Sequence, residues 1–356
     1  MPTLLNTVAA VVDALTNAPP GSTIYLDLHS PDTPEGAFGR LVTPRHIRDI
    51  TLVGRVSGSE RTTFQSILGD DLTEFSFVSM GVRGPKVEGQ SPGVGRFDRC
   101  EGLQFRDFRV DGVDRSPQGL TIGTCRDVVI EDCEFVNCFH GLVGDPVNGI
   151  VVKNCDFHEI RCDGLHGAWE AVRIEGCDFH DFHPEGDVGN TGDHSDAIQF
   201  YCNNVTPDDW DNGTNPVGFE VLDCRIWRGT NPEASQGVFF RQTSGMPFQD
   251  VTIRDVGVFG GMVRSISMGD SVPTSTLVID RCEVCSWSDG DAENIAGIWQ
   301  PNYEDGDQGV YQITNCAAQA FQNSDGVPEG CELLPSDLTR EQVLERQAAW
   351  MAAHPR

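Results

Sequence analysis

Two aspartates stand at matching places in the chain, each just before a short apolar run. Asp163 precedes Gly-Leu-His, and Asp196 precedes Ala-Ile-Gln. Two carboxylates held about 5 Å apart share a proton or bind a cation, and they can serve in general acid and base chemistry. An aspartate at a turn can instead bond to its own backbone. The sequence leaves both interpretations open.

A histidine and several basic or phenolic side chains accompany Asp196. His194 lies two residues before Asp196 and is a candidate general base, with Tyr201 as the alternative base. Arg241 or Arg264 would stabilise negative charge that develops during a reaction. The predicted catalytic residues are Asp196, His194, Asp163 and Arg241.

The side chains around these residues suit a sugar chain. Strand alternation along residues 197–201 places Ile198 and Phe200 inward, and Gln199 and Tyr201 outward. Aromatic rings stack on sugar rings, and fork-shaped polar groups bind hydroxyl or carboxylate groups. The predicted substrate-binding residues are His166, Gln199, Tyr201, Gln236, Phe239, Arg264 and Trp299. Alternatively, a loop or a neighbouring subunit covers the outward aromatic rings.

Metal chemistry has weaker support in the sequence. Five histidines occupy residues 158–194, but their spacing matches no transition-metal motif, so we predict no metal site. The formal net charge is −29, from 54 Asp and Glu against 25 Lys and Arg. This surplus promotes solubility, and it leaves Ca²⁺ open as a ligand of carboxylates. No other cofactor is indicated.

One short pattern recurs and predicts the elements that position these residues. It reads apolar-x-apolar-x-x-Cys-x-apolar, as in Val128-x-Ile130-x-x-Cys133-x-Phe135. Two period-two runs broken by one extra residue indicate two strands that meet at a tight corner. The same position is occupied by Phe108, Cys155, Cys177, Cys224, Val256, Cys282 and Cys316.

Each repeat also carries a third short strand, which includes the predicted site residues. Examples are Gly141-Leu-Val143, Gly237-Val-Phe-Phe240 and Gly297-Ile-Trp299. The first three Cys positions are 22 residues apart, and a repeat of this length indicates a solenoid or array. Because the repeat has no helical period, we predict an all-β fold. It is a single-stranded, right-handed parallel β-helix (a solenoid) with three strands per coil.

The thirteen cysteines follow the repeat rather than a disulfide framework. A position that also accepts Val256 and Phe108 is a core position. We therefore predict buried thiols that act as small apolar side chains.

Helices are predicted at both ends of the chain. Apolar residues from Leu4 to Leu15 form an amphipathic stripe, which predicts an N-terminal capping helix over the open strand edge. A short C-terminal helix is expected over 336–353, with Thr339 and Gln342 as its capping box. The domains are then the capping helix at 1–20, the β-helix at 21–322 and a tail with a helix at 323–356. Residues 56–99 read as irregular or as a coil with long loops.

Composition and patterning exclude two classes of partner. An acidic chain lacks the basic face that a sequence-independent nucleic-acid binder needs. No apolar run reaches 18 residues, so we expect no membrane insertion. The N-terminus has no basic start and no small-residue cleavage site. Together with unpaired thiols, this indicates synthesis in the cytoplasm without a signal peptide.

The arrangement of repeats resembles the pectin-lyase-like superfamily of right-handed parallel β-helices. This family includes pectate lyases, polygalacturonases, alginate lyases, mannuronan epimerases and bacteriophage tailspikes. The run Ser195-Asp-Ala-Ile-Gln199 is similar to the polygalacturonase motif in which Asn-Thr-Asp-Gly enters a strand, and this resemblance implies a catalytic Asp196. The chain has Gln236-Gly-Val where that family has paired aspartates, and it lacks Gly-His-Gly and Arg-Ile-Lys. A hydrolase of that type is therefore not expected.

Two functions follow from the resemblance. The first is a phage or phage-like tail spike or fibre component that binds, and in some cases cleaves, a host surface polysaccharide. It would be a homo-oligomer, by resemblance a trimer, or would assemble with other virion tail proteins. The alternative is a free polysaccharide lyase or epimerase that acts on a uronate polymer. The expected location is the virion tail, with non-classical secretion as the alternative.

Overall fold

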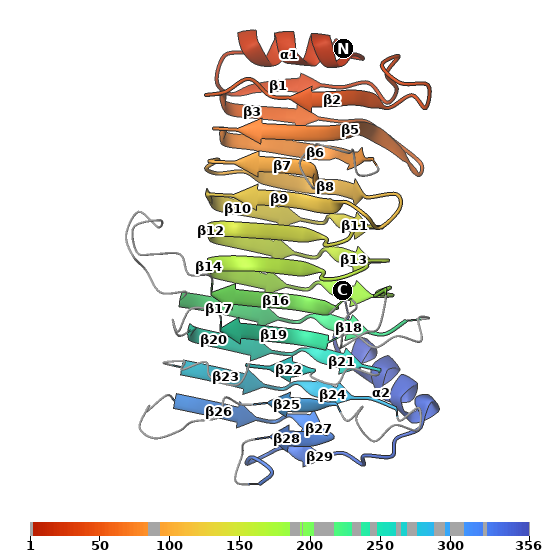
Figure 1. Cartoon of the computed structure of the whole chain (residues 1–356), viewed down its shortest axis with the longest axis vertical. Coiled ribbons are helices and arrows are strands. Elements are labelled where there is room, and N and C mark those ends of the chain that lie inside the picture. Colours follow the sequence, from red (N-terminus) through yellow and green to blue (C-terminus); the bar gives the residue numbers. More distant parts are fainter. Residues whose placement is uncertain are drawn as a thin grey trace. The chain divides into compact units, whose positions relative to one another are not determined.

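The computed structural model describes most of the chain in two compact units, Met1–Ile160 (unit 1) and Arg161–Arg356 (unit 2). We describe each unit by itself (Figure 1). The described residues are 3–84, 93–185, 193, 195–202, 217–229, 236–242, 248–260, 265–268, 276–287, 296–299, 310–322 and 326–355.

Unit 1 consists of parallel strands in three rows, with one short antiparallel pair between β4 (Val56–Ser57) and β5 (Glu60–Asp70). Within a row each strand bonds to the strand one repeat later. Row A contains β1 (Ser22–Tyr25), β3 (Arg48–Val53) and parts of β6 (Thr73–Arg83), β8 (Gln104–Asp111), β10 (Cys125–Glu131) and β12 (Leu142–Lys153). Row B contains parts of β5, β6 and β8, then β11 (Glu134–Val136) and β13 (Asp156–His158). Row C contains β2 (Phe38–Val42), parts of β5 and β12, β7 (Gly93–Asp98) and β9 (Gln118–Gly123).

Unit 2 has the same three rows, and the chain visits rows A, B and C in that order as far as β28, after which β29 belongs to row B. Row A contains part of β14 (Leu165–Glu175), β17 (Val217–Leu222), β20 (Gln249–Arg254), β23 (Thr276–Asp280) and β26 (Val310–Thr314). Row B contains β15 (Asp178–His180), β18 (Arg225–Trp227), β21 (Gly257–Phe259), β24 (Glu283–Cys285), β27 (Ala317–Ala318) and β29 (Glu332–Leu333). Row C contains the start of β14, β16 (Asp196–Cys202), β19 (Gln236–Gln242), β22 (Ile266–Ser267), β25 (Gly297–Trp299) and β28 (Ala320–Gln322). The predicted third strand of the repeat is row C.

A single left-handed residue makes the corner between rows A and B. It stands directly before the Cys position, as at Asp132 (φ 54°), Asp223 (φ 51°) and Asn315 (φ 53°). Asp and Asn tolerate this conformation because their short polar side chains bond locally. The extra residue in the sequence pattern is therefore this turn residue.

The interior is filled by aromatic rings and thiols. Phe135 and Phe157 stack in unit 1 with their ring centroids 4.5 Å apart. The Cys position is buried in each described repeat, and its Sγ bonds to the carbonyl two residues earlier, at 3.2 Å for Cys133 and 3.3 Å for Cys224. All twelve cysteines whose side chains the structure describes are free thiols, which confirms the prediction.

Of the two alternatives for residues 56–99, the coil agrees with the described residues, and irregular structure was wrong for them. Strands β5, β6 and β7 lie there, and β6 carries the repeat as Phe75-x-Phe77-x-x-Met80-x-Val82. All four of these side chains are buried. Met80 takes the place of the cysteine, as Phe108 and Val256 do in other repeats.

Two helices accompany the strands. Helix α1 (Val8–Asn17) begins at the N-cap Thr7, contacts β1 and β2, and buries Val11 and Leu15. Helix α2 (Arg340–Ala353) begins with the predicted capping box of Thr339 and Gln342. Among the described residues, neither helix is long and apolar enough to span a membrane.

Helix α2 lies against row B of unit 2. Val343 is fully buried, and Trp350 packs near Phe259 in a cluster that includes Cys285 and Trp287. Arg346 forms ion pairs with Glu283 at 2.7 Å and with Glu332 at 3.3 Å. Apolar burial and these ion pairs hold the C-terminal segment to unit 2.

Candidate functional site

The residues of row C that the sequence placed outward lie in register across five strands of unit 2, although two of them, Gln199 and Ser267, are buried. His166 pairs with Gln199, Gln199 with Phe239, Phe239 with Ser267, and Ser267 with Trp299. Neighbouring strands are about 4.8 Å apart, so these side chains form one continuous line. We call the line from His166 to Trp299 the row C ladder.

Asp163 and His166 are hydrogen-bonded to each other at the first strand of the row C ladder. Asp163 Oδ2 lies 2.7 Å from His166 Nδ1, and the aspartate side chain is 3% exposed while that of the histidine is 24% exposed. The other carboxylate oxygen, Oδ1, accepts the backbone N–H of Asp196 at 2.9 Å. Asp163 thus uses one oxygen to join neighbouring strands and the other to orient an imidazole that reaches the surface.

Asp196 occupies the matching position one strand later and is almost completely buried. Its Oδ2 accepts a hydrogen bond from Gln199 Nε2. Ser195 Oγ donates to the carbonyl of Cys162 at 2.8 Å, which fixes the chain just before β16.

Burial and nearby carboxylates also act on the thiol beside this pair. Burial raises the pKa of Cys162, and the charges of Asp163, Asp193 and Asp196 raise it further. The thiol therefore stays protonated at neutral pH and is not a nucleophile.

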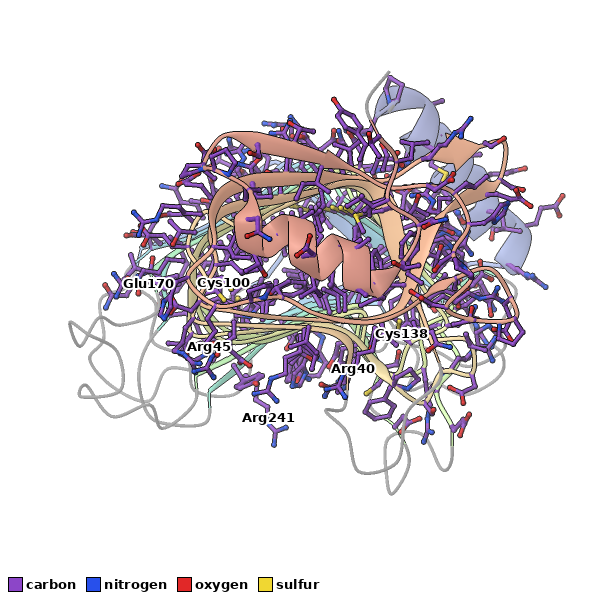
Figure 2. The ribbon with its side chains drawn as sticks, turned by 90° about the horizontal axis from the view of Figure 1, so that it is seen from above. Arg40, Arg45, Cys100, Cys138, Glu170 and Arg241 are labelled. Atoms are coloured by element: carbon purple, nitrogen blue, oxygen red, sulfur yellow. The ribbon has the colours of Figure 1, made fainter. Side chains whose placement is uncertain are left out.

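Tyr201 and Arg241 extend the site along the surface. The ring of Tyr201 lies 4.8 Å from that of His166, at an angle of 52°. Arg241 pairs in register with Tyr201 on the next strand and is exposed. In Figure 2, Arg241 projects outward from the strand layer. Imidazole, phenol and guanidinium groups are thus brought onto adjacent strands.

At the other end of the row C ladder, Trp299 forms an aromatic surface. A Cβ placed on Gly297 would lie 2.9 Å from Trp299 Nε1 and 3.2 Å from Cδ1, so the indole lies over this glycine. Trp299 and Phe239 are both half-buried. The sequence indicated an outward tryptophan, but the role of Gly297 in letting it lie flat was missed.

Two of the predicted residues, His194 and Arg264, lie outside the described residues. Gln236 pairs in register with Asp196 and is half-buried. The sequence named Asp163 and His166 but in separate roles, and it missed the hydrogen bond between them. The available signal was their spacing of three residues, with Asp163 just before the strand and His166 on it.

Other histidines serve different contacts. In unit 2, His180 stacks on Trp227 in row B with ring centroids 4.4 Å apart and bonds to Asp181 at 2.7 Å. In unit 1, His158 pairs with Glu134 at 3.2 Å. Both histidines lie on row B strands, β13 and β15, and so away from row C.

Comparison with known proteins bears on the fold. No protein-family profile and no curated protein matches the chain. Among solved structures, a surface adhesin of Streptococcus pneumoniae, PfbA, aligns over 89% of this chain and 90% of its own, with a TM-score of 0.52 and 8% identity. The pectate lyase Pel9A aligns over 89% of this chain and 74% of its own, with a TM-score of 0.44 and 12% identity. The periplasmic alginate epimerase AlgG aligns over 86% of this chain and 82% of its own, with a TM-score of 0.41 and 9% identity.

The fold is that of the pectin-lyase-like parallel β-helix proteins. The resemblance expected from the repeats is confirmed. At these identities the likeness concerns the β-helix alone, because one fold carries many unrelated functions. The function must therefore be argued from the site.

Proposed function

We propose that row C of unit 2 binds a polysaccharide. The observation that carries this proposal is the row C ladder, which lines up a histidine, a glutamine and two aromatic rings in one register. A polymer of repeating sugars presents similar groups at regular intervals. A strand repeat of about 4.8 Å offers matching groups along the same direction.

The two aromatic side chains of the row C ladder favour a sugar rather than a protein as the ligand. Trp299 lies over Gly297 and presents a flat ring, and Phe239 is half-buried two strands earlier. Sugar rings stack on such faces through their C–H groups, while a buried protein interface would need more apolar area. Arg241 supplies a cation for a carboxylate or other anionic group on the sugar.

We further propose that the ligand is a host surface glycan and that the chain is a receptor-binding component of a phage or phage-like tail. The β-helix fold and the row C ladder are what supports this proposal. An oligomer, by resemblance a trimer, and location in the virion tail belong to the same proposal.

The winding of the strands is part of the proposal as well. We propose one single-stranded, right-handed solenoid in which α1 caps the first coil. The constant order of rows A, B and C supports the winding, since parallel connections are right-handed in nearly all proteins. The burial of Val11 and Leu15 beside β1 and β2 supports the cap.

Glycan binding by alanine variants of Trp299 and Phe239 tests the proposed function. We expect wild-type protein to bind particular polysaccharides on a glycan array or in a capsule pull-down. Loss of one stacking ring removes about 1–3 kcal/mol, so each variant should bind about 10- to 100-fold more weakly.

The matched control is Tyr25→Ala, which removes an aromatic ring that is 38% exposed on β1 of unit 1. It should leave binding unchanged. Equal affinity of wild type, Trp299→Ala and Phe239→Ala for every bound glycan would exclude row C as the binding surface.

A second candidate function is polysaccharide lyase or epimerase activity on a uronate polymer, favoured by the Asp163–His166 pair. A carboxylate on Nδ1 fixes the tautomer of an imidazole and leaves proton acceptance to Nε2. Tyr201 lies beside this ring, and Arg241 could neutralise the carboxylate of the sugar. This set favours His166 as the base, in place of His194 or Tyr201.

The test is the ultraviolet absorbance of unsaturated products during incubation with alginate, pectate and capsule extracts. We expect activity to fall by about 10²- to 10⁴-fold in His166→Gln, the usual contribution of a general base. An epimerase would show no absorbance but would incorporate solvent deuterium at C5. Binding without either signal would leave the proposed function standing and remove the second candidate.

A further inference from the structure

Three cysteines of unit 2 form a line that ends at the surface. Cys282, Cys316 and Cys331 directly precede β24, β27 and β29, whose first residues pair in register. The N–H of Cys282 donates to Cys316 Sγ at 3.4 Å, and the N–H of Cys316 donates to Cys331 Sγ at 3.3 Å. We call these residues the thiol line.

One member of the thiol line differs from the others in exposure. Cys282 and Cys316 are buried, whereas Cys331 is half-buried. Among the cysteines whose side chains the structure describes, Cys331 alone is not buried. In unit 1, Cys100 and Cys125 make a similar contact at 3.3 Å, but both are buried. Reaction with a soluble oxidant therefore begins at Cys331, since access controls thiol reactivity.

The strand that follows Cys331, β29, can adjust its position. β29 has only two residues, both exposed, and it pairs with β27. Directly opposed residues of neighbouring strands have Cα atoms about 4.8 Å apart, inside the range of about 4.4–6.8 Å for disulfides. A short exposed strand can move by the fraction of an ångström that the bond requires, whereas the buried Cys282–Cys316 contact is held by strands on both sides.

We propose that Cys331 and Cys316 form a reversible disulfide that fastens the C-terminal segment to the strand rows of unit 2. The oxidant is a low-molecular-weight disulfide such as oxidised glutathione. The Cys331 thiolate attacks one sulfur of it, and one glutathione thiolate leaves. Cys316 then attacks the Cys331 sulfur of the mixed disulfide, and the second glutathione leaves. The protein loses two electrons and two protons, and the oxidant becomes two glutathione thiols.

The segment that the bond would fasten carries α2. Glu332 forms an ion pair with Arg346 of α2, and Leu334 lies in the apolar cluster beneath the helix. A covalent link at residue 331 reduces the number of conformations open to this segment when it detaches. Oxidation therefore stabilises the docked state of α2, and reduction lets it detach more often.

The test treats the full-length, reduced protein with oxidised glutathione and locates the product by mass spectrometry. Trypsin does not separate these cysteines, because no Lys or Arg lies between Arg281 and Arg340. Cleavage after Glu and Asp separates Cys316 from Cys331, owing to Asp325 and Glu329. Burial raises the pKa of Cys331, so the reaction should be faster at pH ~9 than at pH ~7.

We expect wild type to lose two hydrogen masses and to yield a Cys316–Cys331 cross-linked peptide. Hydrogen exchange of residues 340–353 should then slow by about 10-fold. Cys331→Ser, a change at a half-buried position, should give no cross-link, and Cys138→Ser should behave as wild type. A stable glutathione adduct on Cys331 of wild type, a Cys282–Cys316 link, or no reaction at Cys331 would each overturn the proposal.

Discussion

The residue before each Cys position shows how single side chains determine the corners of the repeat. Asp255 (φ 54°) and Arg281 (φ 51°) both take the left-handed conformation there, although arginine has no local bond to favour it. Arg281 instead binds Asp255 through two hydrogen bonds of 2.7 and 2.6 Å. Ion pairs between successive corners therefore supplement local backbone preference.

A second residue-scale feature is a carboxylate whose titration depends on the fold. The hydrogen bond with His158 lowers the pKa of Glu134, and the nearby Arg109 lowers it further. The folded pKa lies below the ordinary value of about 4.3, so the unfolded chain binds the proton more readily. Stability from Glu134 is complete above that value and is lost as the pH falls through the folded pKa.

Chemical denaturation of Glu134→Gln from pH 7 to pH 3 measures this contribution. We expect the variant to be less stable than wild type at pH 7 and the difference to shrink as the pH falls below about 4.3. A difference that stays constant over this range would mean that the carboxylate charge contributes nothing.

At the scale of elements, the docking of α2 depends on a glycine in β21. A Cβ on Gly257 would lie 2.6 Å from Trp350 Nε1 and 2.6 Å from the ring of Phe259. Trp350 is therefore able to lie against the strand only because this position has no side chain. Helix α2 buries only one residue completely, Val343. Its position on row B therefore depends on contacts such as that of Trp350 with Gly257 more than on an apolar face of its own.

Gly257→Ala should displace α2 while leaving the strands in place. Overpacking of this kind costs about 1–3 kcal/mol. We expect faster hydrogen exchange over residues 340–353 and a lower denaturation midpoint. Gly39→Ala in β2 is the matched control, because an added Cβ there meets other atoms no closer than 3.8 Å. Unchanged exchange in Gly257→Ala would show that Trp350 does not anchor the helix.

At the scale of the whole molecule, charge is distributed unevenly along the chain. Residues 1–160 hold 14 Lys and Arg against 22 Asp and Glu, whereas residues 161–356 hold 11 against 32. Unit 2 therefore carries most of the negative charge and also the proposed polysaccharide site. An anionic polymer would approach it more easily at higher ionic strength, since salt screens the repulsion beyond about 10 Å.

The proposed oligomer belongs to this scale too. Light scattering coupled to size-exclusion chromatography should return about three times the chain mass of 38.9 kDa at physiological salt. At very low salt the excess negative charge should favour dissociation. A strict monomer at all protein and salt concentrations would contradict the trimer and weaken the tail-component proposal.

Much of the fold could be predicted because inward and outward side chains alternate along each strand of the repeat. Val128, Ile130 and Phe135 all face the interior, as the period-two pattern requires, and row C lies where the third strand was expected. The prediction of irregular structure failed over β6, where Met80 replaces the cysteine. This position is defined by burial rather than by residue type, because Phe108, Val256 and Met80 are all buried there.

The sequence alone determined the repeat, the two helices and the place of row C within the repeat, because strand alternation and capping preferences act over a few residues. Only the tertiary structure decided which outward groups meet. Asp163 bonds to the backbone of Asp196, 33 residues later, and Trp299 finds room over Gly297. Such contacts depend on strand register, on side-chain direction and on the absence of a Cβ, and local sequence preferences do not encode these features.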